Sequence, residues 1–282
     1  MPNAPSTNRA PVSPSPVHRM VEQATVASQA TRGTLLALIV ACVSGFLFQF
    51  DLTALSAALP DIGSSLSARL VDQAWIIDVY SLALIFALPL AGPVADRYGR
   101  RRAFMTGGIL FALASALCAT AATLFSLLAW RVLQGISGAA LTVSASALLA
   151  AAYPGPRRGW AFGIWGTVIG ASMVAGPPLG ALIAAMLGWP WVFWINVPIC
   201  LGLVLLVGRT ASEKAILRKY DPLDWAGPAT LALCIGAVAF LMLAGDGLAE
   251  SGFISIPVVL GGAIIALALF ISVERLARCA RV

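Results

Sequence analysis

Long, uninterrupted apolar runs dominate this sequence of 282 residues. A helix needs about 20 apolar residues to cross the roughly 30 Å of hydrocarbon in a bilayer. Eight runs fit this requirement: Leu35–Leu59, Trp75–Val94, Ala103–Ala122, Leu124–Ala151, Trp160–Leu187, Trp191–Val207, Trp225–Ala244 and Phe253–Val273. The runs are continuously apolar and do not alternate as the strands of a membrane barrel do. The sequence therefore predicts an all-α polytopic membrane protein.

The charge content agrees with lipid surroundings. Only 11% of the residues are charged and 60% are hydrophobic, whereas a soluble domain carries about 25% charged residues. The net charge of +6 does not indicate a nucleic-acid-binding protein, because the basic residues lie in short connections between the apolar runs. We expect the lipid bilayer, and no nucleic acid, as a partner.

The basic residues also predict the orientation in the membrane. All but two of the 18 Lys and Arg residues lie before the first run, after the last run, or in every second connection between runs. The exceptions are Arg69, in a connection on the opposite side, and Arg131, inside a run. Cytoplasmic connections are enriched in Lys and Arg. The pattern predicts a multi-pass protein of an inner or plasma membrane with both termini in the cytoplasm.

The remaining segments are short and polar. Residues 1–33 are rich in Pro, Ser, Thr and Ala and predict a disordered cytoplasmic tail. Residues 209–224 form a cytoplasmic linker and residues 274–282 a basic cytoplasmic tail. The five cysteines show no paired spacing, and no nucleophile, metal-ligand set or phosphate loop is recognisable. We expect no enzymatic activity, no cofactor and no metal site.

Three ionisable side chains lie inside apolar runs: Asp51, Asp78 and Arg131. A charge at the bilayer centre costs at least about 2.5–3.5 kcal/mol, so each is a candidate functional residue. Asp78 follows Trp75 by three residues, and this position also fits an interfacial acid with no special role.

Glycines are unusually frequent in the fifth run. Gly166 and Gly170, and also Gly176 and Gly180, are four residues apart, a spacing that allows two helices to approach closely. Pro177 removes a backbone donor and predicts a kink. Two interpretations are open: a tightly packed helix pair, or a bending helix at a seam between moving halves.

The connection after the second run resembles a signature of the major facilitator superfamily. Residues 92–102 read Gly-Pro-Val-Ala-Asp-Arg-Tyr-Gly-Arg-Arg-Arg, with Val94 where Leu is usual. The resemblance implies a conformational latch, in which charged side chains bind helix termini and facing acids in one conformation only. Its residues are Gly92, Asp96, Arg97, Gly99, Arg100 and Arg101.

Two more runs resemble motifs of the same superfamily. Residues 127–140, with Arg131, Gln134, Gly135 and Gly138, are similar to its second motif, although Ser137 replaces a common Gly. The resemblance implies that Arg131 influences proton transfer. The fifth run resembles the motif of the antiporter branches, with Ala181 in place of its final Gly, and this implies export. The matching residues are Gly166, Gly170, Gly176, Pro177 and Gly180.

Further segments resemble one branch, the 14-helix drug:proton antiporters. They are residues 51–60, 191–198 and 224–227, while residues 75–82 look most like exporters of quaternary ammonium compounds and cationic dyes. The resemblance implies that protons and small lipophilic cations are the partners. It assigns Asp51 and Arg131 to proton coupling and Asp78 to the binding of cations.

The resemblance also predicts the domain organisation. Residues 34–208 match the N-terminal six-helix domain, and residues 225–273 match a helix pair inserted after it. Relatives of this kind continue for six more helices, so we expect a truncated or fragmentary antiporter that lacks the C-terminal six-helix domain and does not transport alone. Two alternatives are open: a transport-inactive membrane protein that acts through helix assembly, and an exporter of a neutral or anionic metabolite or antibiotic. Two acids and one base at membrane depth favour a cation.

Overall fold

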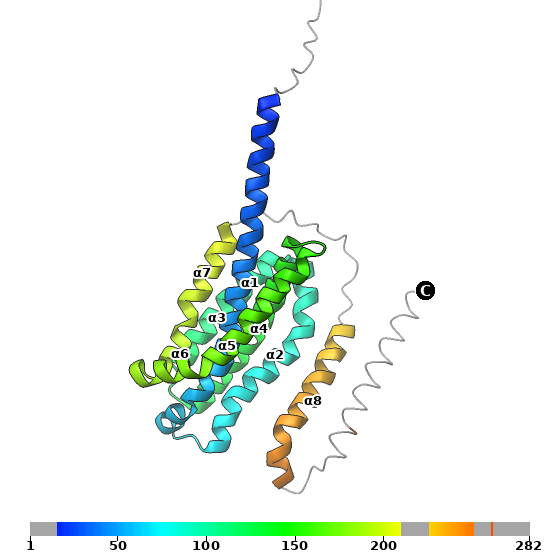
Figure 1. Cartoon of the computed structure of the whole chain (residues 1–282). Coiled ribbons are helices and arrows are strands. Elements are labelled where there is room, and N and C mark those ends of the chain that lie inside the picture. The colour runs from blue at the N-terminus through cyan, green and yellow to red at the C-terminus, as the bar shows by residue number, and fades with distance from the viewer. Residues whose placement is uncertain (1–15, 210–225, 251–260, 262–282) are drawn as a thin grey trace, which may run out of the picture.

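The structure, a computed structural model, describes the backbone of residues 16–209, 226–250 and 261, and the side chains of residues 33–209, 227–240 and 261. Every regular element in these ranges is a helix (Figure 1). The helices are α1 (Pro16–Leu66), α2 (Leu70–Tyr98), α3 (Arg100–Ala119), α4 (Leu124–Ala152), α5 (Arg157–Leu187), α6 (Pro190–Trp194), α7 (Asn196–Arg209) and α8 (Ala226–Glu250).

The prediction of an all-α polytopic membrane protein is confirmed. Six spans in the described ranges are long and apolar enough to cross a bilayer, and they correspond to the first six predicted runs. Helix α8 matches the seventh run, and its described apolar part, Gly227–Phe240, is shorter than a full span. The eighth predicted run, the linker after Arg209 and the basic C-terminal tail lie outside the described residues, apart from residue 261.

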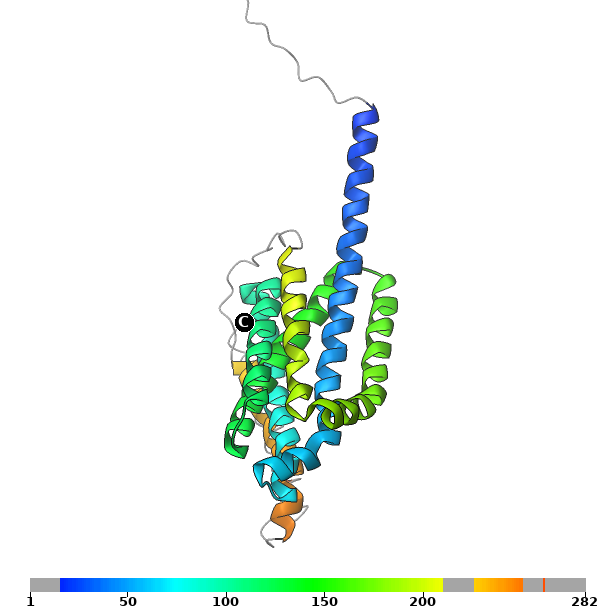
Figure 2. The same ribbon diagram turned by 90° about the vertical axis from the view of Figure 1, so that its left-hand side faces the viewer.

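The predicted disordered tail is wrong for residues 16–33, because α1 already begins at Pro16. Proline is well tolerated at the first helical position, where its missing N–H has no intrahelical partner to lose. The following residues include Met, Glu, Gln and several Ala, which favour helix. The result is a helix of 51 residues whose N-terminal part extends beyond the bundle (Figures 1 and 2).

Helices α1 and α4 occupy the middle of the arrangement. Helix α4 packs along α2 and α3, and α1 packs along α5 while also contacting α4. Helix α5 stands at one edge, beyond α1, as Figure 2 shows. Helix α8 lies beside α2 at the other edge (Figure 1). Side chains of α1 and α4 that face each other therefore lie in the interior.

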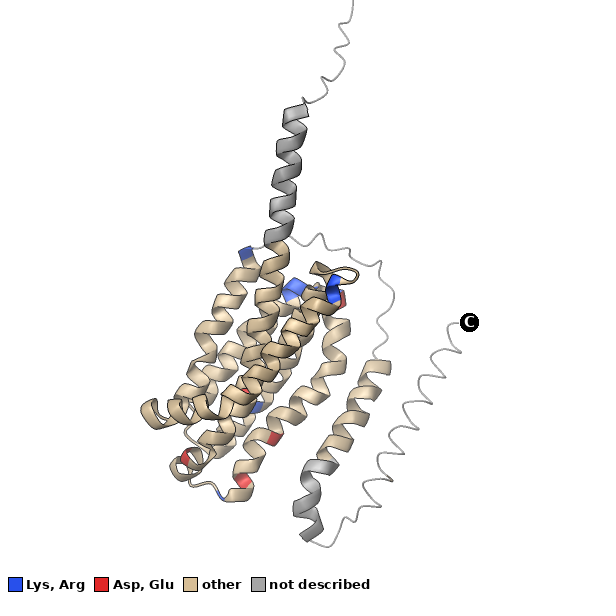
Figure 3. Ribbon diagram, in the orientation of Figure 1, with Lys and Arg blue, Asp and Glu red and all other residues tan. Residues whose placement is uncertain are grey.

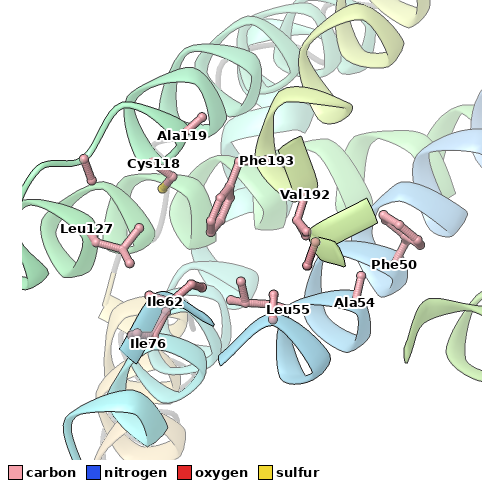
Figure 4. Packing of buried hydrophobic residues seen from close by; sticks show 13 residues of the cluster. Phe50, Ala54, Leu55, Ile62, Ile76, Cys118, Ala119, Leu127, Val192 and Phe193 are labelled. Carbon is pink, nitrogen blue, oxygen red and sulfur yellow. The ribbon is translucent and has the colours of Figure 1, made fainter. Parts of the chain in front are cut away.

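The largest cluster of buried apolar side chains joins α1, α2, α3, α4, α5 and α6 (Figure 4). Phe50, Leu55 and Ile62 of α1 meet Leu127 of α4 and Phe193 of α6. Alanines between these larger residues keep the backbones close, as is typical of membrane helix packing. This packing fixes α1 against α4 and α6 around Asp51, which follows Phe50 in the chain.

The sixth predicted run is two helices, with Ile195 between α6 and α7. Proline has no N–H, so Pro198 cannot donate a helical hydrogen bond to the carbonyl of Trp194. The interruption falls at this unmatched carbonyl and makes Asn196 the first residue of α7. Asn196 is fully buried there.

Candidate functional site

The centre of the bundle holds a buried ion pair. Asp51 of α1 and Arg131 of α4 are both 0% exposed, and Arg131 Nη1 lies 2.6 Å from Asp51 Oδ2. An unpaired charge in such a place would be very costly, so each residue compensates the other. The structure thus brings together two of the three ionisable residues found within the apolar runs.

Two amides complete the surroundings of the Asp51 carboxylate. Gln134 Nε2 donates a hydrogen bond to Asp51 Oδ1 at 2.9 Å, and Asn196 Nδ2 donates to the same oxygen at 2.6 Å. Gln134 Nε2 also donates to Ser115 Oγ at 3.0 Å, which extends the network to α3. One carboxylate therefore connects four helices: α1, α3, α4 and α7.

The Arg131 guanidinium has several neutral partners besides Asp51. Its Nη1 donates to Gln134 Oε1 at 2.7 Å, and its Nε donates to the backbone carbonyl of Ile76 in α2 at 3.0 Å. Its central carbon lies 4.2 Å from the ring centroid of Tyr80 and 5.7 Å from that of Phe193. The positive charge is thus held from α1, α2, α4 and α6 together.

Three buried polar atoms around the ion pair have no hydrogen-bond partner among the described residues. They are Tyr80 Oη, Arg131 Nη2 and Asn196 Oδ1. A buried polar group without a partner costs about 1–3 kcal/mol, and such groups concentrate at functional sites. These atoms add to the reasons for treating the network as a candidate functional site.

Asp78 lies apart from this network. It is half-buried on α2, between the buried residues Ile76 and Tyr80 in sequence and so on a different side of the helix. It forms no hydrogen bond or ion pair within the described ranges. One turn earlier, the Trp75 ring contacts Phe240 of α8 at a centroid distance of 6.4 Å. The structure does not bring Asp78 together with Asp51 or Arg131.

The residues of the predicted latch lie where α2 meets α3. Gly99 joins the two helices with φ +94°, a conformation that side-chain-bearing residues rarely adopt. Arg100 pairs with Asp96 at 3.2 Å and donates to the carbonyl of Ala147 in α4 at 3.3 Å. Arg101 donates to the carbonyls of Val207 at 3.0 Å and Gly208 at 2.5 Å, near the C-terminus of α7.

The other two predicted latch residues make lesser contacts. Arg97 lies 5.8 Å from the ring centroid of Tyr98. A Cβ atom at Gly92 would meet no described atom within 4 Å. Arg100 and Arg101 thus bind α4 and α7 of the same bundle, whereas Gly92 shows no packing requirement in this conformation.

The two glycine pairs of α5 differ. A Cβ atom at Gly176 would collide with the Thr53 side chain, and one at Gly180 would lie 2.6 Å from Ala54 Cα, both in α1. Gly166 and Gly170 have no described atom within 4 Å of such a Cβ. Helix α5 continues through Pro177. The close helix pair is therefore observed for the second glycine pair, and the role of α5 at a moving seam stays a prediction.

The sequence interpretation gave no role to Tyr80, Ser115, Gln134 or Asn196. All four are buried and polar, and Gln134 and Asn196 are uncharged amides inside apolar runs. That placement was the available signal, since an amide in hydrocarbon needs a partner. Within the described part of the chain, no group of three His, Cys, Asp or Glu side chains is arranged to hold a metal ion.

Comparison with known sequences gives a consistent result. The sequence profile of the Major Facilitator Superfamily matches residues 41–277. Multidrug resistance protein 3 of Bacillus subtilis is 37% identical over 191 residues, which is 67% of this chain and 36% of that protein. The Tetracenomycin C resistance and export protein of Streptomyces glaucescens is 39% identical over 181 residues, or 62% of this chain and 34% of that protein.

A third relative covers a similar part. Multidrug export protein EmrB of Haemophilus influenzae is 32% identical over 212 residues, which is 74% of this chain and 41% of that protein. The chain thus spans less than half of the length of the curated relatives it matches. The similarity includes the helices that carry Asp51, Arg131 and Asn196, because the superfamily profile covers all of them.

Proposed function

This chain belongs to the Major Facilitator Superfamily, and we propose that it forms the N-terminal part of a proton-coupled multidrug efflux antiporter. The observation that carries the proposal is the buried pair of Asp51 and Arg131, set in an amide network that joins four helices. Two relatives are named as multidrug resistance or multidrug export proteins, which supports drug efflux. The relevant membrane is the inner or plasma membrane, with both termini in the cytoplasm.

The proton step uses Asp51. A proton on its carboxylate removes the negative charge that attracts Arg131. It also changes the hydrogen bonds that Asp51 accepts from Gln134 and Asn196. Because these donors lie on α4 and α7, protonation alters contacts between three helices at once. A ligand shifts a conformational equilibrium only by binding one state better than the other, and a proton on Asp51 does so through these contacts.

The substrate step uses Asp78. It is half-buried at membrane depth and has no positive partner among the described residues, so its charge is open to a cationic ligand. Aromatic rings one turn away on α2 and on α8 suit a lipophilic cation, because ring faces attract positive charge. We assign lipophilic and quaternary ammonium cations as the substrate class.

The test is dye efflux under an imposed pH gradient. Everted vesicles from cells that express the full-length gene should accumulate a quaternary ammonium dye when their lumen is acidic, because the cytoplasmic face of their membrane is outside. Asp51→Asn should reduce this exchange to the level of vesicles without the protein. Asp61→Asn removes an exposed acid of the same helix and should leave exchange unchanged. Full exchange in Asp51→Asn would contradict the coupling role.

Export of an antibiotic is a second candidate. The name of the Streptomyces glaucescens relative supports it, since that protein is called a Tetracenomycin C resistance and export protein. The same vesicles separate the two candidates when tetracenomycin C replaces the dye. Gradient-driven movement of tetracenomycin C but of no cationic dye would favour the second candidate.

A further inference from the structure

We propose that the aromatic ring of Tyr80, together with that of Phe193, holds the Arg131 guanidinium independently of Asp51. Arg131 then keeps its place and its charge when Asp51 is neutralised. Tyr80 is in this view a positioning residue of the ion-pair site. Its role in proton coupling rests on the proposed function, whereas the arrangement itself is testable on this chain without transport.

The geometry supports a strong interaction. The guanidinium carbon lies 4.2 Å from the centroid of Tyr80, well within the distance of about 6 Å at which a cation is attracted to a ring face. Phe193 adds a second ring at 5.7 Å. Tyr80 is 1% exposed, and Arg131 and Phe193 are 0% exposed, so bulk solvent does not screen the attraction.

Only one partner of Arg131 can be neutralised by a proton. The carboxylate of Asp51 is an acid, whereas Gln134 Oε1, the carbonyl of Ile76 and the two ring faces carry no charge to lose. The other titratable groups near the pair are the Tyr80 phenol and the thiols of Cys118 and Cys200, all neutral when protonated. When Asp51 takes up a proton, the two rings and the neutral oxygens of Gln134 and Ile76 are the partners that still favour a positive charge.

Packing between α2 and α4 explains how Tyr80 reaches this place. A Cβ atom at Gly135 would lie 2.9 Å from Ala83 Cβ and 3.1 Å from the backbone nitrogen of Leu84. One at Gly138 would lie 3.3 Å from Tyr80 Oη. The two glycines after Arg131 therefore allow α2 to approach α4 at backbone distance, with the Tyr80 ring against Arg131.

The hydroxyl of Tyr80 is not what holds this residue. Tyr80 Oη is buried and has no hydrogen-bond partner among the described residues. The ring face, not the hydroxyl, makes the contact with Arg131. This separates two substitutions: Tyr80→Phe keeps the ring, and Tyr80→Leu removes it while keeping an apolar side chain.

The experiment is a double-mutant cycle on thermal stability of the purified chain in detergent. Asp51→Asn represents the neutralised acid. If the ring supports Arg131 when Asp51 is neutral, Tyr80→Leu should lower Tm more in the Asp51→Asn background than alone. The Tm of the double variant should be lower, by about 4 °C or more, than the Tm expected if the two single decreases simply added. Tyr80→Phe should show no such coupling with Asp51→Asn.

Two controls make the result specific. In an Arg131→Met background, which has no guanidinium, the coupling between Tyr80→Leu and Asp51→Asn should disappear. If the Tyr80→Leu, Asp51→Asn variant cannot be purified, the Tyr80→Phe, Asp51→Asn variant should still accumulate like Asp51→Asn alone. Additive shifts, or a Tyr80→Phe variant that behaves like Tyr80→Leu, would overturn the proposal. Neither outcome depends on whether the protein exports drugs.

Discussion

Asp51 accepts hydrogen bonds from three side chains, whereas Asp78 accepts none among the described residues. The two acids therefore differ in what a change of charge does. At Asp51 it disturbs a network that joins four helices. At Asp78 it changes a charge that no described side chain compensates, and this is the condition for recognition of a cationic ligand.

We predict that Asp78→Asn weakens transport of divalent cations more than that of monovalent ones. At the same distance, the Coulomb attraction of a divalent cation to one carboxylate is twice that of a monovalent cation. We expect an increase of about tenfold or more in the apparent KM for a divalent dye, equivalent to about 1.4 kcal/mol, and a smaller one for a monovalent dye. Efflux under a pH gradient measures both, with Asp78→Glu as the charge-conserving control. A uniform loss would favour an interfacial, structural acid.

Their charge within an apolar run was sufficient to select Asp51, Asp78 and Arg131 from the sequence as candidate functional residues, because a charge in lipid costs free energy. The contact between Asp51 and Arg131 was not predictable, since 80 residues separate them and only helix packing brings them together. Asn196 depends further on the interruption between α6 and α7, which moves its side chain to the start of a helix.

At the scale of helices, the contact between α1 and α5 leaves no room for added volume. Ser172 Oγ donates to the carbonyl of Phe46 at 2.8 Å, and Gly180 faces the backbone of Ala54. Backbone atoms cannot move aside as a flexible side chain can. The helix pair is therefore held at a distance that only glycine permits at position 180.

We predict that Gly180→Val destabilises the chain by about 1–3 kcal/mol, because the new side chain forces α5 away from α1. Gly170→Val is a matched control, since it adds the same side chain to the same helix where no described atom lies within 4 Å. Thermal unfolding in detergent should show a lower Tm for the first variant only. Equal values of Tm would contradict the observed contact.

The contact between Asp96 and Arg100 leads to a different prediction, a loss of transport without a loss of stability. Asp96 is 63% exposed, so its ion pair contributes at most about 1 kcal/mol to stability. Asp96→Asn should leave membrane insertion and Tm nearly unchanged and should reduce transport of every substrate alike, because a latch acts on the conformational equilibrium. Transport rates for several dyes provide the measurement. A changed preference among substrates at an unchanged overall rate would show that Asp96 is not part of a latch.

The number of the first six spans and their helical type followed from apolar length, the most robust signal in this sequence. The ends did not. Helix propensity, not apolarity, extends α1 back to Pro16, and a missing proline N–H divides the sixth run near Asn196. The side of α5 that faces α1 decides which glycines contact that helix. The sequence does not reveal this side, because both glycine pairs have the same spacing of four residues.

For the molecule as a whole, the distribution of charge is the main determinant of orientation. Figure 3 shows Arg residues gathered at the end of the bundle where α2 meets α3 and α4 meets α5. The ion pair of Asp51 and Arg131 lies inside α1 and α4 and includes none of these arginines. The predicted orientation and the proposed proton coupling thus depend on separate groups of charges.

We predict that the end of the bundle with the arginines faces the cytoplasm, because cytoplasmic connections are enriched in Lys and Arg.

The test is labelling with a membrane-impermeant maleimide in a variant whose five native cysteines are replaced by Ser. Ser64→Cys lies near the C-terminal end of α1 and Gly159→Cys near the start of α5, and both positions are exposed. Ser64→Cys should react in intact cells, whereas Gly159→Cys should react only after permeabilisation. A Cβ atom at Gly159 meets no described atom within 4 Å, so the substitution itself does not disturb packing. The reverse labelling would contradict the predicted orientation.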